Sequence, residues 1–206
     1  MTTPTRHSLP FSERPAGSRL ARGLLSLLGW TVDFEGVPGR QGVIVAYPHT
    51  SNWDFLVLVL AKWAIGLQVH FWGKDSLFRI PVFGAWLRWL GGVPVIRGAS
   101  QGVVGAMVQT MQAARRDNVF YWLALAPEGT RSHTPGWRSG FYQVALGAGI
   151  PLGLACLDVR RKHVGVTDFL QLSGNMEADM EAIRAALHRA YGFNPLQASP
   201  IQLLQK

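Results

Sequence analysis

The sequence predicts a single α/β domain, built on a largely parallel mixed sheet that is flanked by helices. Short apolar runs rich in Val, Leu and aromatic residues alternate along the chain with longer stretches of helical periodicity, which is typical of parallel sheets covered by helices. The length of 206 residues and the hydrophobic content of 48% suit one domain with its own core. The sequence contains neither an internal repeat nor an interdomain linker.

Residues 1–17 carry Thr, Pro, Ser and Arg without periodicity, which predicts a flexible N-terminal tail. The remainder, 18–206, is expected to form the domain and to begin with an amphipathic helix at 18–30. Four leucines of this helix follow helical spacing and two arginines mark its other face: Leu20, Leu24, Leu27, Leu28, Arg19 and Arg22. The helix either packs on the domain or lies in a membrane interface, with its arginines at the headgroups.

The other elements follow from the same patterns. Strands are predicted at 32–35, 43–46, 69–72, 93–97, 119–125, 152–157 and 164–170, and helices at 54–65, 82–90, 101–116, 141–148 and 176–191. A helix that spans a membrane needs about 20 apolar residues. The most apolar window, 55–72, is interrupted by Lys62, Gln68 and His70, so we expect a buried helix there.

The formal charge of +8 favours anionic partners, and the eight Trp residues favour a membrane surface over nucleic acid. The basic residues are scattered without a nucleic-acid-binding signature, so no nucleic acid is expected as a partner. Cys156 is the only cysteine, which excludes an internal disulfide and fits a cytoplasmic protein. No signal peptide is evident. The six His residues are dispersed, so no metal site is expected.

His49 and Asp54 form the first candidate constellation, directly after the strand predicted at 43–46. A carboxylate one helical turn away can fix the tautomer of an imidazole and leave its other nitrogen free to take a proton. The same stretch also has the pattern of a capped helix start, with Ser51 as N-cap and an acidic residue three positions later. Both readings can hold together, because a capped helix would fix Asp54 firmly.

A second constellation, Glu128, Gly129, Thr130 and Arg131, follows the apolar run at 119–125. Glycine permits close backbone approach, Thr and backbone N–H groups can donate hydrogen bonds, and Arg can hold phosphate. The alternative is an ordinary polar turn with a solvated Glu–Arg pair.

Two further cations follow strands. Arg97 ends the Gly-rich stretch 91–97, and Lys74 follows the strand at 69–72. The carboxyl ends of parallel strands gather at one edge of a sheet. We therefore expect one cationic pocket that contains a base.

An ordered set of blocks carries a family resemblance: His49 with Asp54 (H-x4-D), the Gly-rich stretch ending in Arg97, the E-G-T-R run at 128–131, and the strand that contains Pro151. From about residue 43 to 170 the chain resembles the glycerolipid acyltransferases, typified by lysophosphatidic acid acyltransferase, and most of all their short bacterial members. The sequence departs from many members at Pro48, Pro94 and Ile96.

The resemblance implies that His49 deprotonates the acceptor hydroxyl and that Asp54 orients His49. It implies that Arg97, Arg131 and Lys74 hold phosphate, while Glu128, Gly129 and Thr130 shape the acceptor site. The donor would be acyl-CoA or acyl carrier protein, used as a co-substrate, with no cofactor and no metal. The acceptor would be a lysolipid, and the protein would lie peripherally on the cytoplasmic face of the inner membrane, or otherwise in the cytoplasm.

Two rival functions stay open. The run Gly98-Ala99-Ser100-Gln101-Gly102 fits the G-x-S-x-G nucleophile elbow of serine hydrolases, with Asp158 or Asp168 and then His163 or His188 as candidate partners. Ser100 is equally suited to cap the following helix. The second rival is a non-catalytic basic protein that binds a lipid surface.

Overall fold

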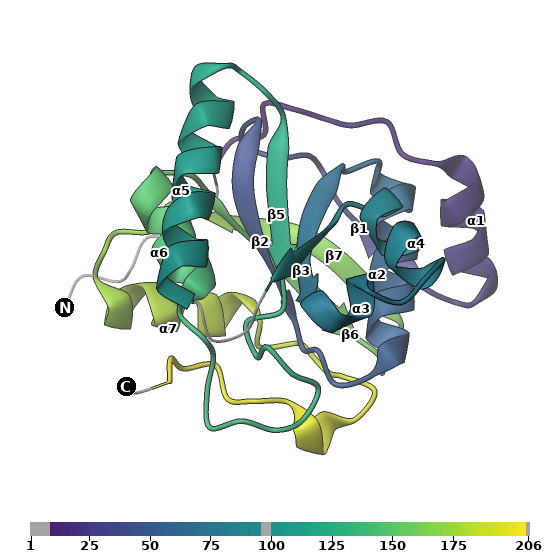
Figure 1. Cartoon of the computed structure of the whole chain (residues 1–206). Coiled ribbons are helices and arrows are strands. Elements are labelled where there is room, and N and C mark those ends of the chain that lie inside the picture. Colours follow the sequence, from purple (N-terminus) through teal and green to yellow (C-terminus); the bar gives the residue numbers. More distant parts are fainter. Residues whose placement is uncertain (1–8, 96–99, 205–206) are drawn as a thin grey trace.

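The centre of the molecule is one seven-stranded sheet with the order β1-β7-β6-β2-β5-β3-β4. The computed structural model describes residues 9–95 and 100–204 (Figure 1). The strands are β1 (Thr31–Asp33), β2 (Gln41–Tyr47), β3 (Val69–Lys74), β4 (Gly92–Val95), β5 (Tyr121–Leu125), β6 (Leu152–Asp158) and β7 (His163–Leu170). All neighbours pair in parallel except β6 and β7, which pair antiparallel. The predicted single α/β domain with a largely parallel mixed sheet is confirmed.

Helices cover both faces of this sheet. The helices are α1 (Arg19–Leu27), α2 (Asn52–Ile65), α3 (Asp75–Phe78), α4 (Phe83–Trp89), α5 (Ser100–Arg116), α6 (Gly140–Ala148) and α7 (Met176–Ala186), with a 3₁₀ turn at η1 (Pro195–Gln197). In Figure 1, α5, α6 and α7 lie on one side of the sheet and α1 to α4 on the other. The short α3 and η1 were not predicted, because four and three residues are too few to show a helical period.

Strand β2 shows how the sequence builds both cores. Val43 and Val45 pack in the cluster beneath α5, α6 and α7, whereas Ile44 packs with Ile65 and Trp122 in the cluster on the other face. Successive side chains of a strand point to opposite faces, so a strand covered on both sides must be apolar at every position. The continuous apolar run at 43–46 fits the central place of β2, which lies between β6 and β5.

The N-terminal residues that the structure describes are attached to the domain, in contrast to the flexible tail expected at 1–17. The backbone N–H groups of Ser12 and Glu13 donate to the carbonyl of Val37 at 2.9 and 3.1 Å. The ring of Phe11 packs edge-on against Phe169, with 5.9 Å between centroids. An aromatic ring in a stretch without periodicity can still gain a buried partner through tertiary contact. The first eight residues lie outside the described part of the chain.

The amphipathic helix predicted at 18–30 is present as α1, with Ser18 as its N-cap accepting from the N–H of Ala21 at 3.2 Å. Ala21 and Leu25 are buried, whereas Leu20 and Leu27 are 75% and 83% exposed. The helix thus packs on the domain by a narrow face and leaves most of its leucines uncovered.

Helix α2 occupies the apolar window in which a buried helix was expected. It ends at Gly66, whose φ of 73° is the left-handed conformation that favours glycine. Near that end, Lys62 Nζ donates to the carbonyl of Leu90 at 2.6 Å and ties α2 to the end of α4. Within residues 9–95 and 100–204, no helix has the length and apolarity needed to cross a bilayer.

Candidate active site

The site lies where parallel neighbouring strands end. Strand β2 ends at Tyr47, two residues before His49, and β5 ends at Leu125, directly before the turn that holds Glu128 and Arg131. Because β2, β5 and β3 pair in parallel, these ends meet at one edge of the sheet, where Lys74 ends β3. The predicted gathering of the motifs at one edge therefore exists. Arg97 lies outside the described residues, and β4 ends at Val95, which is paired with Lys74.

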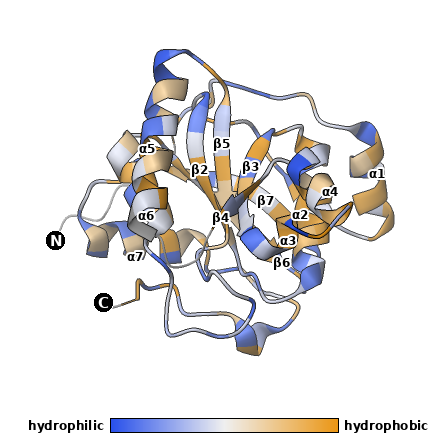
Figure 2. Cartoon of the chain, in the orientation of Figure 1, coloured by the Kyte–Doolittle hydropathy of each residue, from blue (hydrophilic) through white to orange (hydrophobic). Residues whose placement is uncertain are grey.

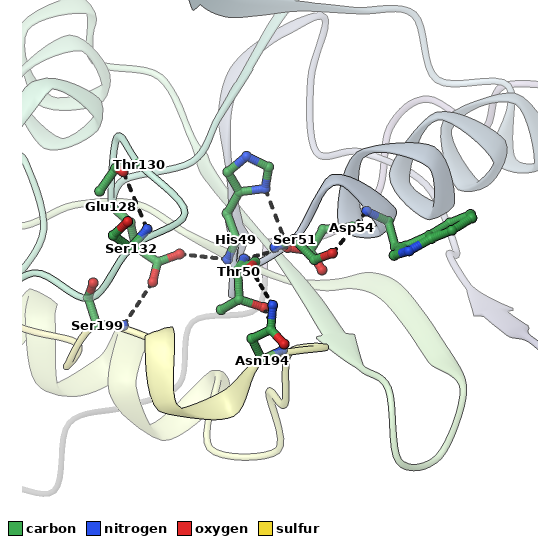
Figure 3. Close-up of polar contacts among 10 residues, drawn as sticks. His49, Thr50, Ser51, Asp54, Glu128, Thr130, Ser132, Asn194 and Ser199 are labelled. Atoms are coloured by element: carbon green, nitrogen blue, oxygen red, sulfur yellow. Dashed lines mark hydrogen bonds and ion pairs between the residues drawn. The ribbon is translucent and has the colours of Figure 1, made fainter.

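His49 and Asp54 face each other across the start of α2 (Figure 3). Nδ1 of His49 lies 3.6 Å from Oδ2 of Asp54. Oδ2 also accepts hydrogen bonds from the backbone N–H groups of Thr50 and Ser51, the latter at 2.7 Å. Ser51 is the N-cap, and its hydroxyl accepts from the N–H of Trp53 at 3.2 Å. The cap and the His–Asp pair thus coexist, and the cap holds the carboxylate in place.

Oδ1 of Asp54 is buried and has no hydrogen-bond partner among the described residues. A buried acceptor without a partner costs free energy. The imidazole of His49 lies next to this carboxylate, with Nδ1 at 3.6 Å from Oδ2, which is longer than a normal hydrogen bond.

Burial dominates the electrostatics of His49. Burial, followed by the positive charge of Arg131, lowers the pKa of His49 to about 4. The side chain is 19% exposed, so its edge can still reach a substrate. Burial also raises the pKa of Asp54, against the lowering effect of the Ser51 and Thr50 N–H groups. The neutral imidazole is the form that accepts a proton, and His49 holds it throughout the physiological range.

Glu128 points into the protein and not toward open solvent. It is 1% exposed, and its Oε2 accepts from the backbone N–H of His49 at 2.6 Å. Its Oε1 accepts from the backbone N–H of Ser199 at 2.8 Å. Burial raises its pKa, while these two N–H groups lower it. In this orientation Glu128 joins the two motif loops to each other, and its expected role in shaping the acceptor site stays a prediction.

The rest of the turn is compact. Gly129 has a φ of 68°, and a Cβ there would lie 2.6 Å from Nε of Arg138. The left-handed conformation favours glycine here, and the side chain of Arg138 packs over the space that a Cβ would occupy. The hydroxyl of Thr130 accepts from the N–H of Ser132 at 3.3 Å. Arg131 is exposed, with its charge close enough to act on His49 and Asp54.

An apolar cavity of about 170 Å³ begins at His49. Along one wall it follows the inner face of α2, at Phe55, Leu58, Val59 and Ala61. The segment 77–90 is rich in aromatic residues. Of that segment only Leu90 lines the cavity, and Phe83 and Trp89 are exposed.

The contribution of C-terminal residues to the site was not predicted from the sequence. Asn194 and Ser199 both bond the motif loops, as Figure 3 shows, and Gln197 lies between them. These polar residues stand among prolines without any period or recognisable spacing. No local pattern could have identified them, because their partners lie more than seventy residues away.

The partners proposed for a Ser100 hydrolase are engaged elsewhere. Nε2 of His163 lies 2.8 Å from Oδ2 of Asp33, and Oδ1 of Asp158 accepts from the N–H of Arg160 at 3.1 Å. Nδ1 of His188 lies 2.7 Å from the carbonyl of Ala185. Ser100 begins α5, with its side chain and the preceding residues 96–99 outside the description. These contacts do not support a catalytic triad with Ser100.

The sequence also matches a known protein family, and this match does not depend on the geometry of the site. A family model described as Acyltransferase matches residues 31–153, which is more than half of the chain. The chain belongs to the glycerolipid acyltransferase family. The matched residues contain His49, Asp54 and the turn at 128–131.

Two known proteins are similar to this chain. A chloroplastic 1-acyl-sn-glycerol-3-phosphate acyltransferase of Brassica napus is 24% identical over 127 residues, which cover 60% of this chain and 36% of the relative. This chain thus matches only about a third of that protein. The crystal structure of the 1-acyl-sn-glycerophosphate (LPA) acyltransferase PlsC from Thermotoga maritima superposes with a TM-score of 0.54 at 18% identity. It covers 82% of this chain and 74% of PlsC, and it shows that the fold is shared.

Proposed function

We propose that this acyltransferase-family protein moves a fatty acyl group from an acyl thioester to a hydroxyl of a lysophospholipid. The observation that carries the proposal is the position of His49: a neutral imidazole, backed by a buried carboxylate, at the start of an apolar cavity. Base, hydroxyl acceptor and acyl chain then meet at one point. Family membership supports the reaction class.

In the proposed reaction, Nε2 of His49 takes the proton of the acceptor hydroxyl while the hydroxyl oxygen attacks the thioester carbonyl carbon. The C–S bond then breaks, and the protonated imidazole returns its proton to the leaving thiolate. Asp54 stabilises the imidazolium that forms between the two steps. No covalent acyl-enzyme is needed, and positioning of both substrates supplies much of the acceleration.

The acceptor is proposed to carry a phosphate that binds at the cationic edge. The exposed guanidinium of Arg131 lies beside His49, and Lys74 ends the neighbouring strand. Arg97 is included in this proposed phosphate site because it ends the Gly-rich block of the family. Arginine binds phosphate in a bidentate fashion. Both named relatives are described as acting on acyl-glycerophosphates, which supports lysophosphatidic acid as the first acceptor to test.

The donor is proposed to be acyl-CoA or acyl carrier protein, with its acyl chain in the cavity below α2. The part of α2 that lines the cavity, from Phe55 to Ile65, is about 15 Å long at the usual rise per residue, which suits an extended acyl chain. An acidic carrier protein would be attracted by the formal charge of +8.

A membrane surface is the proposed source of the acceptor. Figure 2 shows apolar residues along α1, α2 and α4, on one side of the sheet. The exposed residues include Leu27 at 83% and, between α3 and α4, Val82 at 85%. Arg19 and Arg79 are exposed beside them. Apolar groups edged by arginines suit an anionic leaflet, to which the protein would bind peripherally.

The deciding experiment incubates the protein with long-chain acyl-CoA or acyl carrier protein and a panel of lysolipids, and resolves the products by mass. Wild type, His49→Ala and Ser100→Ala run side by side. Acylated lysolipid from wild type and Ser100→Ala, but not from His49→Ala, is the expected result and names the acceptor. Free fatty acid alone, released only when Ser100 is present, would show a hydrolase instead.

A further inference from the structure

The C-terminal segment 191–204 crosses the site outside the region that the family model matches, which ends at residue 153. It is anchored where the N–H of Tyr191 donates to the carbonyl of Leu157 at 2.8 Å. It is anchored again where the N–H of Trp137 donates to the carbonyl of Gln202 at 2.7 Å. Between these anchors the segment runs along both motif loops, as the yellow ribbon in Figure 3 shows.

On one side the segment holds the loop of His49 through Thr50, the next residue. The backbone N–H of Asn194 donates to Oγ1 of Thr50 at 3.2 Å, and Nδ2 of Asn194 donates to its carbonyl at 3.1 Å. Gly192 packs so closely that a Cβ there would lie 2.4 Å from the same Oγ1. Thr50 is itself buried, so its position is set by this segment.

On the other side the segment holds the turn at 128–131. The N–H of Ser199 donates to Glu128, and Glu128 in turn accepts from the N–H of His49. The side-chain amide of Gln197 faces the carbonyl of Arg131 at 2.7 Å and the carbonyl of Thr50 at 3.1 Å, and we assign its nitrogen to this side, because only an N–H group can donate to both carbonyls. One side chain of η1 therefore bonds both loops.

We propose that Gln197 is a positioning residue that sets the distance between His49 and Arg131. The inference rests on the proposed function, in which these two side chains serve the same acceptor. The two loops follow different strands, so a small shift between them changes where the phosphate sits relative to the base. A two-donor amide that bridges their carbonyls restricts that shift. Errors of about 1 Å in such positions can lower rates by about 10²-fold.

The charged groups around His49 supply a readout that a purely structural role would leave unchanged. Asp54 faces it from α2, and Glu128 and Arg131 face it from the turn after β5. If the turn moves outward, water reaches His49 and the charge of Arg131 recedes. Both changes favour the protonated imidazole, so the pKa of His49 rises.

The test compares Gln197→Ala with Gln202→Ala. Gln202 is a matched control, because it has the same side chain in the same segment and donates to the carbonyl of Pro135 at 2.8 Å, away from His49. Gln197 is exposed, so its removal leaves the core intact. Two measurements are made on each full-length variant: kcat and KM for the lysolipid, and the NMR titration of His49, assigned with His49→Ala.

We expect Gln197→Ala to lower kcat/KM for the acceptor about tenfold, in keeping with the loss of a bonded pair. Its His49 should titrate at least about half a pH unit higher than in wild type. Gln202→Ala should stay within about twofold of wild type, with an unchanged titration. Equal effects of the two variants, or an unshifted His49 in Gln197→Ala, would overturn the inference. If wild type acylates no lysolipid, the proposed function fails, and the titration alone still decides the role of Gln197.

Discussion

The residue His49 performs its proposed task only when neutral. Burial and then the charge of Arg131 lower its pKa to about 4. Protonation below that pKa removes the base, so kcat/KM should stay level from neutral pH down to about pH 5 and fall toward pH 4. In Arg131→Gln the lowering charge is gone, and the acid limb should move to higher pH. A pH–rate profile of kcat/KM measures both, and an acid limb near the ordinary histidine pKa in wild type would contradict the assignment.

Asp54 combines a cap with an orienting carboxylate, and two substitutions separate these roles. Asp54→Asn keeps the shape but loses the charge that stabilises an imidazolium, so kcat should fall about 10²-fold or more. Ser51→Ala removes the cap hydroxyl and should cost about 1 kcal/mol of stability, with kcat nearly unchanged. Steady-state kinetics and thermal unfolding of both variants test this. Wild-type kcat in Asp54→Asn would exclude an orienting role.

Glu128 is expected to act through the backbone that it holds. In Glu128→Gln one of the two buried N–H groups, on His49 or Ser199, would face an amide NH₂. A buried unsatisfied donor costs about 1–3 kcal/mol, so the free energy of unfolding should drop by that amount and kcat with it. Urea unfolding of Glu128→Gln is compared with that of Glu177→Gln, whose side chain is exposed. Equal stability of the two variants would show that the buried contacts of Glu128 contribute little.

At the scale of the element, α2 contributes both to the His49–Asp54 pair and to the wall of the cavity. Its first turn holds Asp54, and its inner face lines the cavity as far as Ile65. Ala61 lines the cavity midway to the far end, so Ala61→Phe should block its deeper part. We expect the preferred acyl chain to become shorter while transfer of short chains persists, as measured with a series of acyl-CoA lengths. Leu56→Phe, on the exposed side of α2, is the control. An unchanged preference in Ala61→Phe would place the acyl chain elsewhere.

At the scale of the whole molecule, the uncovered apolar side chains of α1, α2 and α4 are expected to meet a membrane. Burying a leucine contributes about 1.5–3 kcal/mol, so the double variant Leu20→Ser/Leu27→Ser should bind vesicles at least about tenfold more weakly. Co-sedimentation with vesicles containing phosphatidylglycerol measures this. Val119→Ser removes a half-exposed apolar side chain just before β5, at the end of that strand away from the candidate site. This variant should bind vesicles like wild type. Equal binding of all three proteins would exclude this surface.

Much of the architecture follows from the sequence because its signals are local. The run at 43–46 is apolar at every position, which only a doubly covered strand requires, and β2 is the strand between β6 and β5. Ser51 as N-cap places the start of α2 at Asn52, as found, whereas the apolar period alone placed it at Asp54. The order of the motifs along strand ends likewise predicts that they gather at one edge, since parallel strands leave no other arrangement.

The sequence by itself thus determined the fold class, the positions of the main strands, the His–Asp pair and the family to which the chain belongs. Only the tertiary structure decided that Glu128 turns inward, that the cavity follows α2, and that the described N-terminal residues are attached to the domain. It also brought Gln197 to Thr50 and Arg131. The physical reason is the range of each interaction. Caps and strand alternation act between neighbours in the chain, whereas the direction of a buried carboxylate or a bridging amide depends on partners that only folding brings near.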